Sequence, residues 1–148
     1  MEQISLYHQQ TFDQTLERIN KLTPDTKPQW GKMDVAQMMA HCAEILDVSN
    51  GKPLQNTPWV ARLFKGYIKK MVIGPKPYPK NTKTHPQYLQ TTPKDFEDEK
   101  RHLLKALDKL KEMEGQAIEH TLFGVLNKEE KGWAMYKHLD HHLVQFGV

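Results

Sequence analysis

The chain has 148 residues, of which 38% are hydrophobic and 26% are charged, and its formal net charge is +3. This composition excludes a disordered chain, and the length predicts a single domain, residues 1–148, that can bury a core. The small positive excess is too weak to indicate a nucleic acid as partner. One cysteine excludes an internal disulfide framework and favours a reducing compartment.

The first residues, MEQISLYHQQTFDQ, have neither the basic nor the apolar region of a secretory signal. No stretch of the sequence approaches the about 20 apolar residues that span a bilayer. We therefore expect a cytoplasmic protein without a membrane partner.

The first two predicted helices flank a segment that breaks helices. In residues 11–22, Phe12, Leu16 and Ile19 follow the i, i+4, i+7 spacing of an amphipathic helix. Residues 24–33 contain two prolines and a glycine, which end that pattern. The second helix is predicted from Asp34, with Gln37 as its capping-box partner, to the stop signal Asn50-Gly51.

Two further helices are predicted in the C-terminal half. Thr92 is a suitable N-cap for the third, and Pro93 fits its first position. The fourth is predicted from Asn127, with Glu130 as capping partner, to Gly147. No segment shows sustained strand alternation, so the predicted fold class is all-α.

A long connection, residues 51–91, joins the second and third predicted helices and contains six prolines. A connection of this length predicts a crossover, with the two helices parallel and the connection shaping a cavity. Part of it, residues 57–74, is expected to form a short helix that covers the bundle as a fixed lid. Basic residues there could serve a membrane surface or a nucleic acid, but we expect a solvated face. These residues are Arg62, Lys65, Lys69 and Lys70.

Three histidines lie within five positions in the stretch YKHLDHHLVQF, residues 136–146. At about 100° per residue, His138 and His142 share one face of a helix at the edge of its apolar arc. His141 points about 100° away from His142, towards solvent or a position behind the ligands. His41 lies at the rim of the apolar arc of the second helix.

Two histidines one turn apart and one from a neighbouring helix make a face of three ring nitrogens. Such a face is typical of catalytic zinc sites, which keep a coordination position open. The alternative is ordinary half-buried histidines that bond to backbone or carboxylate oxygens. Spacing alone leaves both interpretations open.

Three stretches carry a resemblance to a known family: WGKMDVAQMMAHCAE, HTLFGVLNKEEKGWAMYKHLDHHLVQFG and MVIGPKPYPKN. Together they resemble the DinB-like superfamily, and in particular its small bacterial branch of unknown function. The resemblance implies a four-helix bundle that binds a divalent metal through His41, His138 and His142. Imidazole ligands favour Zn²⁺ or Ni²⁺, with Fe²⁺ as a third choice.

Two classes of function follow as hypotheses, and the resemblance implies the first of them. The first is a metal-dependent thiol S-transferase, with a low-molecular-weight thiol as substrate, or a hydrolase. The alternative is a non-catalytic module, stabilised by metal or associated with stress. The residues decide neither the substrate nor the oligomeric state, for which a homodimer is one option.

Other residues have expected places near the site or at the surface. Cys42 is expected to be a small buried hydrophobe. His120 could reach the cavity mouth or simply pack its ring, and Glu44 could orient a ligand imidazole from behind. His85 and His102 stand alone in polar surroundings and are expected at the surface.

Overall fold

The computed structural model describes residues 4–148. This part of the chain is mostly helical, and its five α-helices are α1 Gln9–Asn20, α2 Val35–Ser49, α3 Lys65–Ile73, α4 Phe96–Glu112 and α5 Lys128–Gln145. Two short 3₁₀ helices, η1 (Trp59–Phe64) and η2 (Pro86–Tyr88), lie in the connection between α2 and α4. Among residues 4–148, no helix has the length and apolar character that crossing a bilayer requires.

Capping boxes fix the starts of two helices where the sequence predicts them. The Asp34 carboxylate accepts from the Gln37 N–H, and the Gln37 side chain accepts from the Asp34 N–H. Asn127 and Glu130 make the same reciprocal pair at the start of α5. Each box satisfies N–H groups that have no partner within the helix, so both predicted starts are confirmed.

The helix α4 begins later than predicted, because Asp95 and not Thr92 is its N-cap. The Asp95 carboxylate accepts a 2.9 Å hydrogen bond from the Asp98 N–H. An aspartate at this position also interacts favourably with the positive end of the helix dipole. Thr92 lies outside the helix, and its carbonyl accepts from the Gln37 side chain at 3.0 Å.

The described chain is mostly helical, as the all-α prediction expected, but it also contains one short two-stranded sheet. Strand β1 (Glu119–His120) pairs antiparallel with β2 (Gly124–Val125) just before α5. Gly124 has a φ of 78°, a left-handed conformation that glycine adopts without steric cost. Strands this short show no alternation that a sequence pattern could reveal.

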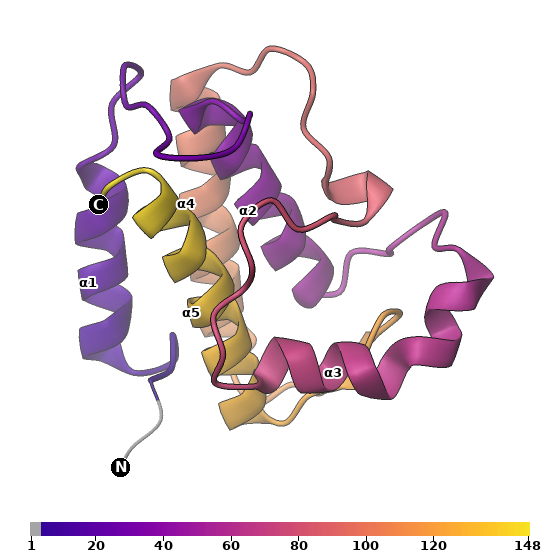
Figure 1. Ribbon diagram of the computed structural model, residues 1–148. Coiled ribbons are helices and arrows are strands. Elements are labelled where there is room, and N and C mark those ends of the chain that lie inside the picture. Colours follow the sequence, from indigo (N-terminus) through magenta and orange to yellow (C-terminus); the bar gives the residue numbers. More distant parts are fainter. Residues whose placement is uncertain (1–3) are drawn as a thin grey trace.

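Helices α2 and α4 run parallel, as the long connection predicted. Gln37, at the start of α2, bonds to Thr92 just before α4, and the Asn50 amide after α2 donates to the Ala106 carbonyl within α4 at 3.1 Å. Residues 51–91, here called the crossing segment, therefore return from the end of α2 to the start of α4 (Figure 1).

Helices α1 and α5 form a second parallel pair. The Leu6 N–H donates to the Gly132 carbonyl at 3.2 Å, and Arg18 lies 2.7 Å from Asp140. The C-terminal end of α5 lies beside the chain that enters α2, because Gln145 donates to the Trp30 carbonyl. The α1–α5 pair therefore runs opposite to the α2–α4 pair (Figure 1).

The core lies between these four helices and contains the completely buried side chains Leu6, Ile19, Met38, Leu103, Leu107, Leu110 and Leu143. Cys42 belongs to it, with its thiol 3.8 Å from the Met38 sulfur. Burial raises the pKa of this thiol, so it is a packed apolar group, as predicted.

Residues 57–74, the predicted lid, cover the four long helices only in part. Trp133 donates to the Ile73 carbonyl at 3.0 Å, and Lys137 donates to the Met71 and Gly74 carbonyls, which attaches the end of α3 to α5. Neither η1 nor α3 contains a buried residue, however. The first half of this helical stretch projects from the four long helices instead of covering them (Figure 1).

Candidate metal centre

Two helices bring together the three histidines that the sequence singled out. His41 comes from the middle of α2, and His138 and His142 lie one turn apart on α5. One ring nitrogen of each lies within 4.8 Å of the others, and the Nε2 atoms of His41 and His138 are 3.2 Å apart. This group, called the histidine cluster, could hold a metal ion.

The backbone of the crossing segment orients His41. Its Nδ1 lies 2.9 Å from the carbonyl oxygen of Tyr88, the last residue of η2. A carbonyl only accepts hydrogen bonds, so Nδ1 carries the proton and Nε2 keeps a free lone pair. That lone pair is the one that faces the other two histidines.

A side-chain amide orients His142 in the same way. Its Nδ1 lies 2.7 Å from Oε1 of Gln145, while Nε2 of that amide donates to the Trp30 carbonyl at 2.8 Å. The second bond fixes which amide atom faces the ring, since only the NH₂ group can donate to a carbonyl. His142 is therefore protonated on Nδ1 and has a free Nε2.

Burial keeps the histidine cluster neutral. It lowers the pKa of His138 well below its ordinary value and that of His142 from 6.5 to about 3, and it also lowers the pKa of His41. Neighbouring histidines add to the effect at α5, because His142 and His41 lower the pKa of His138 and His41 lowers that of His142. Metal ligation requires unprotonated nitrogens, which this environment provides.

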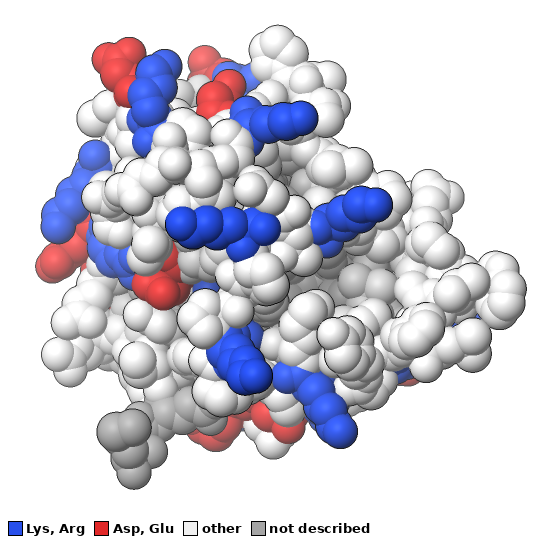
Figure 2. Space-filling model, in the orientation of Figure 1, with Lys and Arg blue, Asp and Glu red and all other residues white. Residues whose placement is uncertain are grey.

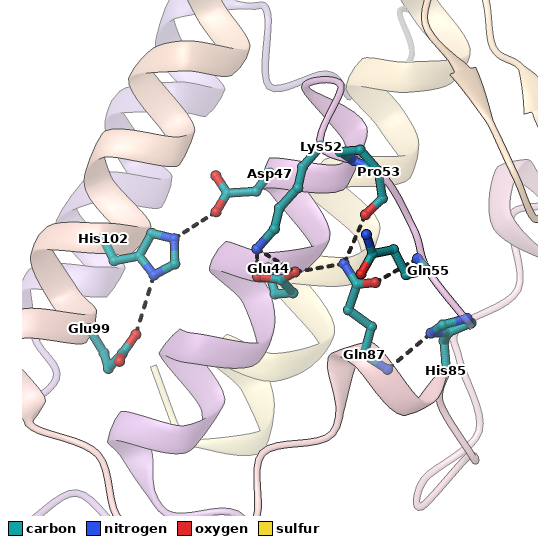
Figure 3. A network of polar contacts seen from close by, with 9 residues as sticks. All are labelled: Glu44, Asp47, Lys52, Pro53, Gln55, His85, Gln87, Glu99 and His102. Atoms are coloured by element: carbon teal, nitrogen blue, oxygen red, sulfur yellow. Dashed lines mark hydrogen bonds and ion pairs between the residues drawn. The ribbon is translucent and has the colours of Figure 1, made fainter. Parts of the chain in front are cut away.

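Glu44 does not contact the histidine cluster, which corrects its expected role as a direct orienter. Its carboxylate lies 2.8 Å from Lys52 and accepts from Gln87 at 2.9 Å (Figure 3). Gln87 also donates to the Pro53 carbonyl and accepts from the backbone of Gln55. Since Gln87 immediately precedes Tyr88, Glu44 helps to hold the carbonyl that orients His41.

Aromatic rings lie over the outer side of the cluster. The Tyr78 ring, from the crossing segment, is 6.2 Å from His138 and 6.0 Å from His141. Trp30 meets His141 edge-on at 5.8 Å. His141 is therefore part of this aromatic cover and is outside the three-nitrogen group, as its angular position predicted.

His120 is buried but also outside the group. Its ring stacks on Phe123 at 3.8 Å, its Nδ1 accepts from the Leu122 N–H, and its Nε2 lies 3.3 Å from the Tyr88 hydroxyl. It thus packs at the end of β1, before α5, and contacts Tyr88, whose carbonyl orients His41. Burial first, then the nearby charges of His85 and Lys131, lowers its pKa from 6.5 to about 4.

The two histidines that were expected alone at the surface have partners. His102 lies 2.7 Å from Asp47 and 3.4 Å from Glu99, linking α4 to α2 (Figure 3). His85 lies 2.9 Å from the Thr57 hydroxyl and accepts from the Gln87 N–H. Both are half-buried and hold the crossing segment or the helix pair in place.

The sequence did not identify the groups that orient the ligands. The Tyr88 carbonyl has no side-chain signature, and it reaches His41 only because the crossing segment folds back. Gln145 offered a usable signal, since it lies three residues after His142 and i, i+3 residues are neighbours on a helix.

Comparison with known proteins gives one match. A family model described as "Protein of unknown function (DUF1569)" matches residues 1–147. No curated protein and no solved structure matches the chain.

Proposed function

The chain belongs to the DUF1569 family, and from that premise we propose that it binds one divalent metal ion through His41, His138 and His142. The observation that carries the proposal is the paired orientation of two ligands. His41 and His142 each donate Nδ1–H to a fixed oxygen, which leaves Nε2 for a metal. Metal-binding histidines typically have such partners behind them.

The donor set fits a divalent transition metal. Three neutral imidazoles suit Zn²⁺ or Ni²⁺ best, followed by Fe²⁺, and a hard cation such as Mg²⁺ would instead require oxygen ligands. Three protein ligands leave a tetrahedral ion with one free position. We assign α1, α2, α4 and α5 to a DinB-like four-helix bundle, which is supported by their two parallel pairs and their shared core.

We further propose that the site serves a metal-dependent thiol S-transferase or hydrolase in the cytoplasm. A divalent ion lowers the pKa of a water or thiol that binds it, and so supplies a nucleophile at neutral pH. The protein would hold the ligands neutral, and the rings of Tyr78 and Trp30 would limit the access of water. The second candidate is a module that the ion only stabilises, favoured by the close packing of the cluster.

Elemental analysis of tag-free protein tests the metal site. Wild type, His142→Ala and His141→Ala would be reconstituted with Zn²⁺ or Ni²⁺ and dialysed equally. We expect equimolar metal in wild type and in His141→Ala, because His141 is not part of the cluster. His142→Ala should hold no stoichiometric metal. Full metal in His142→Ala, or none in wild type, would refute the site.

Cobalt substitution distinguishes the two candidate functions, a metal-dependent enzyme and a module that the ion only stabilises. Adding a low-molecular-weight thiol to the Co²⁺ protein should produce a thiolate charge-transfer band if a coordination position is exchangeable. The spectrum would stay unchanged for a purely stabilising ion, and removal of that ion would then lower the unfolding temperature as its main effect.

A further inference from the structure

One stretch of the chain has basic but no acidic residues, although the net charge of the whole chain is small. Residues 48–94 contain nine lysines and arginines and no aspartate or glutamate. All 18 acidic residues lie elsewhere, together with the other 12 of the 21 basic ones. This stretch is therefore strongly cationic, and the remainder of the chain is acidic.

The same stretch exposes large apolar side chains. Trp59 is 73% exposed, Leu63 71% and Tyr67 70%. With Val60, Phe64 and Met71, these residues of η1 and α3 form a surface here called the apolar corner. Soluble proteins rarely leave so many large apolar side chains together in water, so a patch of this kind indicates an interaction site.

The apolar corner is convex. In Figure 1, η1 and the start of α3 project from the four long helices, and the face of this projection that Figure 2 shows is almost entirely uncharged. Sites for peptides and small molecules are concave, lined by walls on several sides. A projecting apolar corner instead suits insertion into a fluid surface.

The cations beside the corner remain available to a partner. Arg62, Lys65 and Lys70 make no ion pair within the described residues, whereas Lys69 lies 3.5 Å from Glu130. A second copy that docks on the same surface with two-fold symmetry would place these cations opposite one another. Like charges at that interface disfavour self-association and favour an anionic partner.

We propose that the apolar corner and its flanking cations bind the protein to an anionic lipid surface. Trp59, Leu63 and Tyr67 would enter the headgroup region, where aromatic rings and apolar side chains are favoured. Arg62, Lys65 and Lys70 would interact with the anionic headgroups. Aliphatic side chains such as Leu63 contribute to burial in lipid but cannot stack on bases, which favours lipid over single-stranded nucleic acid.

Vesicle cosedimentation of the full chain tests the proposal. The vesicles would be pure phosphatidylcholine or phosphatidylcholine with phosphatidylserine, at low and at physiological salt. We expect binding to the anionic vesicles only, weakened by salt because the attraction is screened. Brominated lipids should quench the Trp59 fluorescence of the bound protein, and the Trp59→Phe variant should lose that part of the quenching.

Matched variants distinguish vesicle binding by the apolar corner from non-specific binding. Leu63→Ser with Tyr67→Ser should reduce vesicle binding about tenfold or more, and so should Arg62→Gln with Lys70→Gln. The controls are Val144→Ser, an exposed apolar residue of α5, and Lys105→Gln on α4, which should bind as wild type does.

Three outcomes would overturn the proposal: no binding to anionic vesicles, binding that ignores the corner variants, or equal losses in the controls. Light scattering tests whether the corner binds a second copy of the chain. A single-stranded oligonucleotide tests whether it binds nucleic acid. A dimer that Leu63→Ser abolishes would assign the corner to a second copy. Oligonucleotide binding tighter than vesicle binding, lost with the same residues, would assign it to nucleic acid.

Discussion

The Nδ1 atom of His41 lies 2.9 Å from the carbonyl oxygen of Tyr88, and this contact joins helix α2 to the crossing segment. It fixes the tautomer of His41 and points Nε2 towards the α5 histidines. The geometry of the cluster therefore depends on where the crossing segment is anchored, as well as on the two helices.

Loss of the Gln87 side chain should weaken metal binding without touching a ligand. Gln87 ties η2 to Glu44 and to the Pro53 carbonyl, so Gln87→Ala frees the Tyr88 carbonyl to move. Loss of such a supporting partner typically lowers metal affinity about 10- to 100-fold. Competition with a chromophoric chelator measures this. Gln55→Ala is the control, since Gln55 contributes only its backbone N–H to Gln87.

Gln145→Met should have a comparable effect at the other ligand. It removes the oxygen that accepts from His142 Nδ1 at 2.7 Å and also the donor to Trp30. The ring then loses its fixed tautomer, and metal affinity should fall about 10- to 100-fold. Val144→Met, one residue earlier on the exposed face, should leave the affinity unchanged. Equal affinities for Gln145→Met and wild type would exclude this role.

The bound metal should persist below the ordinary titration range of histidine. Burial lowers the pKa of His142 from 6.5 to about 3 and that of His138 well below 6.5. A lowered pKa means that protons compete for the ligand nitrogens only at lower pH. Dialysis of Zn²⁺-loaded protein across a pH series, followed by elemental analysis, measures release. A release midpoint at 6.5 would show that the sites titrate as free imidazoles.

The metal-free protein should lose stability as the pH falls below 6.5, partly through His120. Its pKa is about 4 when folded and 6.5 when unfolded. Below 6.5 the unfolded chain binds the extra proton, so acid favours unfolding. From pH 7 to pH 5 this residue alone should cost about 2 kcal/mol. Urea unfolding in chelator would show a smaller pH dependence for His120→Asn; an unchanged slope would contradict the assignment.

Replacing Lys131 with methionine should stabilise the protein. Lys131 is only 5% exposed, its amine has no hydrogen-bond partner among residues 4–148, and burial lowers its pKa. The surrounding pocket includes Ile118, Phe123 and Leu126, so a thioether fits better than an unpaired amine. We expect a gain of about 1 kcal/mol in the free energy of unfolding. Lys105→Met on the exposed face of α4 should bring no such gain.

The sequence alone determined the features that depend on local spacing. Helical periodicity placed the four long helices, and the capping boxes at Asp34 and Asn127 fixed two of their starts. The angular positions of His138, His141 and His142 were also readable, because a helix has a fixed rotation per residue. The length of the connection indicated that α2 and α4 run parallel.

Only the tertiary structure decided what surrounds the histidine cluster. The Tyr88 carbonyl lies 47 positions from His41, and Glu44 reaches Gln87 across 43 positions. Tyr78, which covers His138, is likewise distant from it in the chain. No local pattern encodes such contacts, because they arise when the crossing segment folds back over α2 and α5. The exposure of Trp59 and Leu63 likewise required the tertiary structure, since an amphipathic stretch looks the same whether it covers a core or faces water.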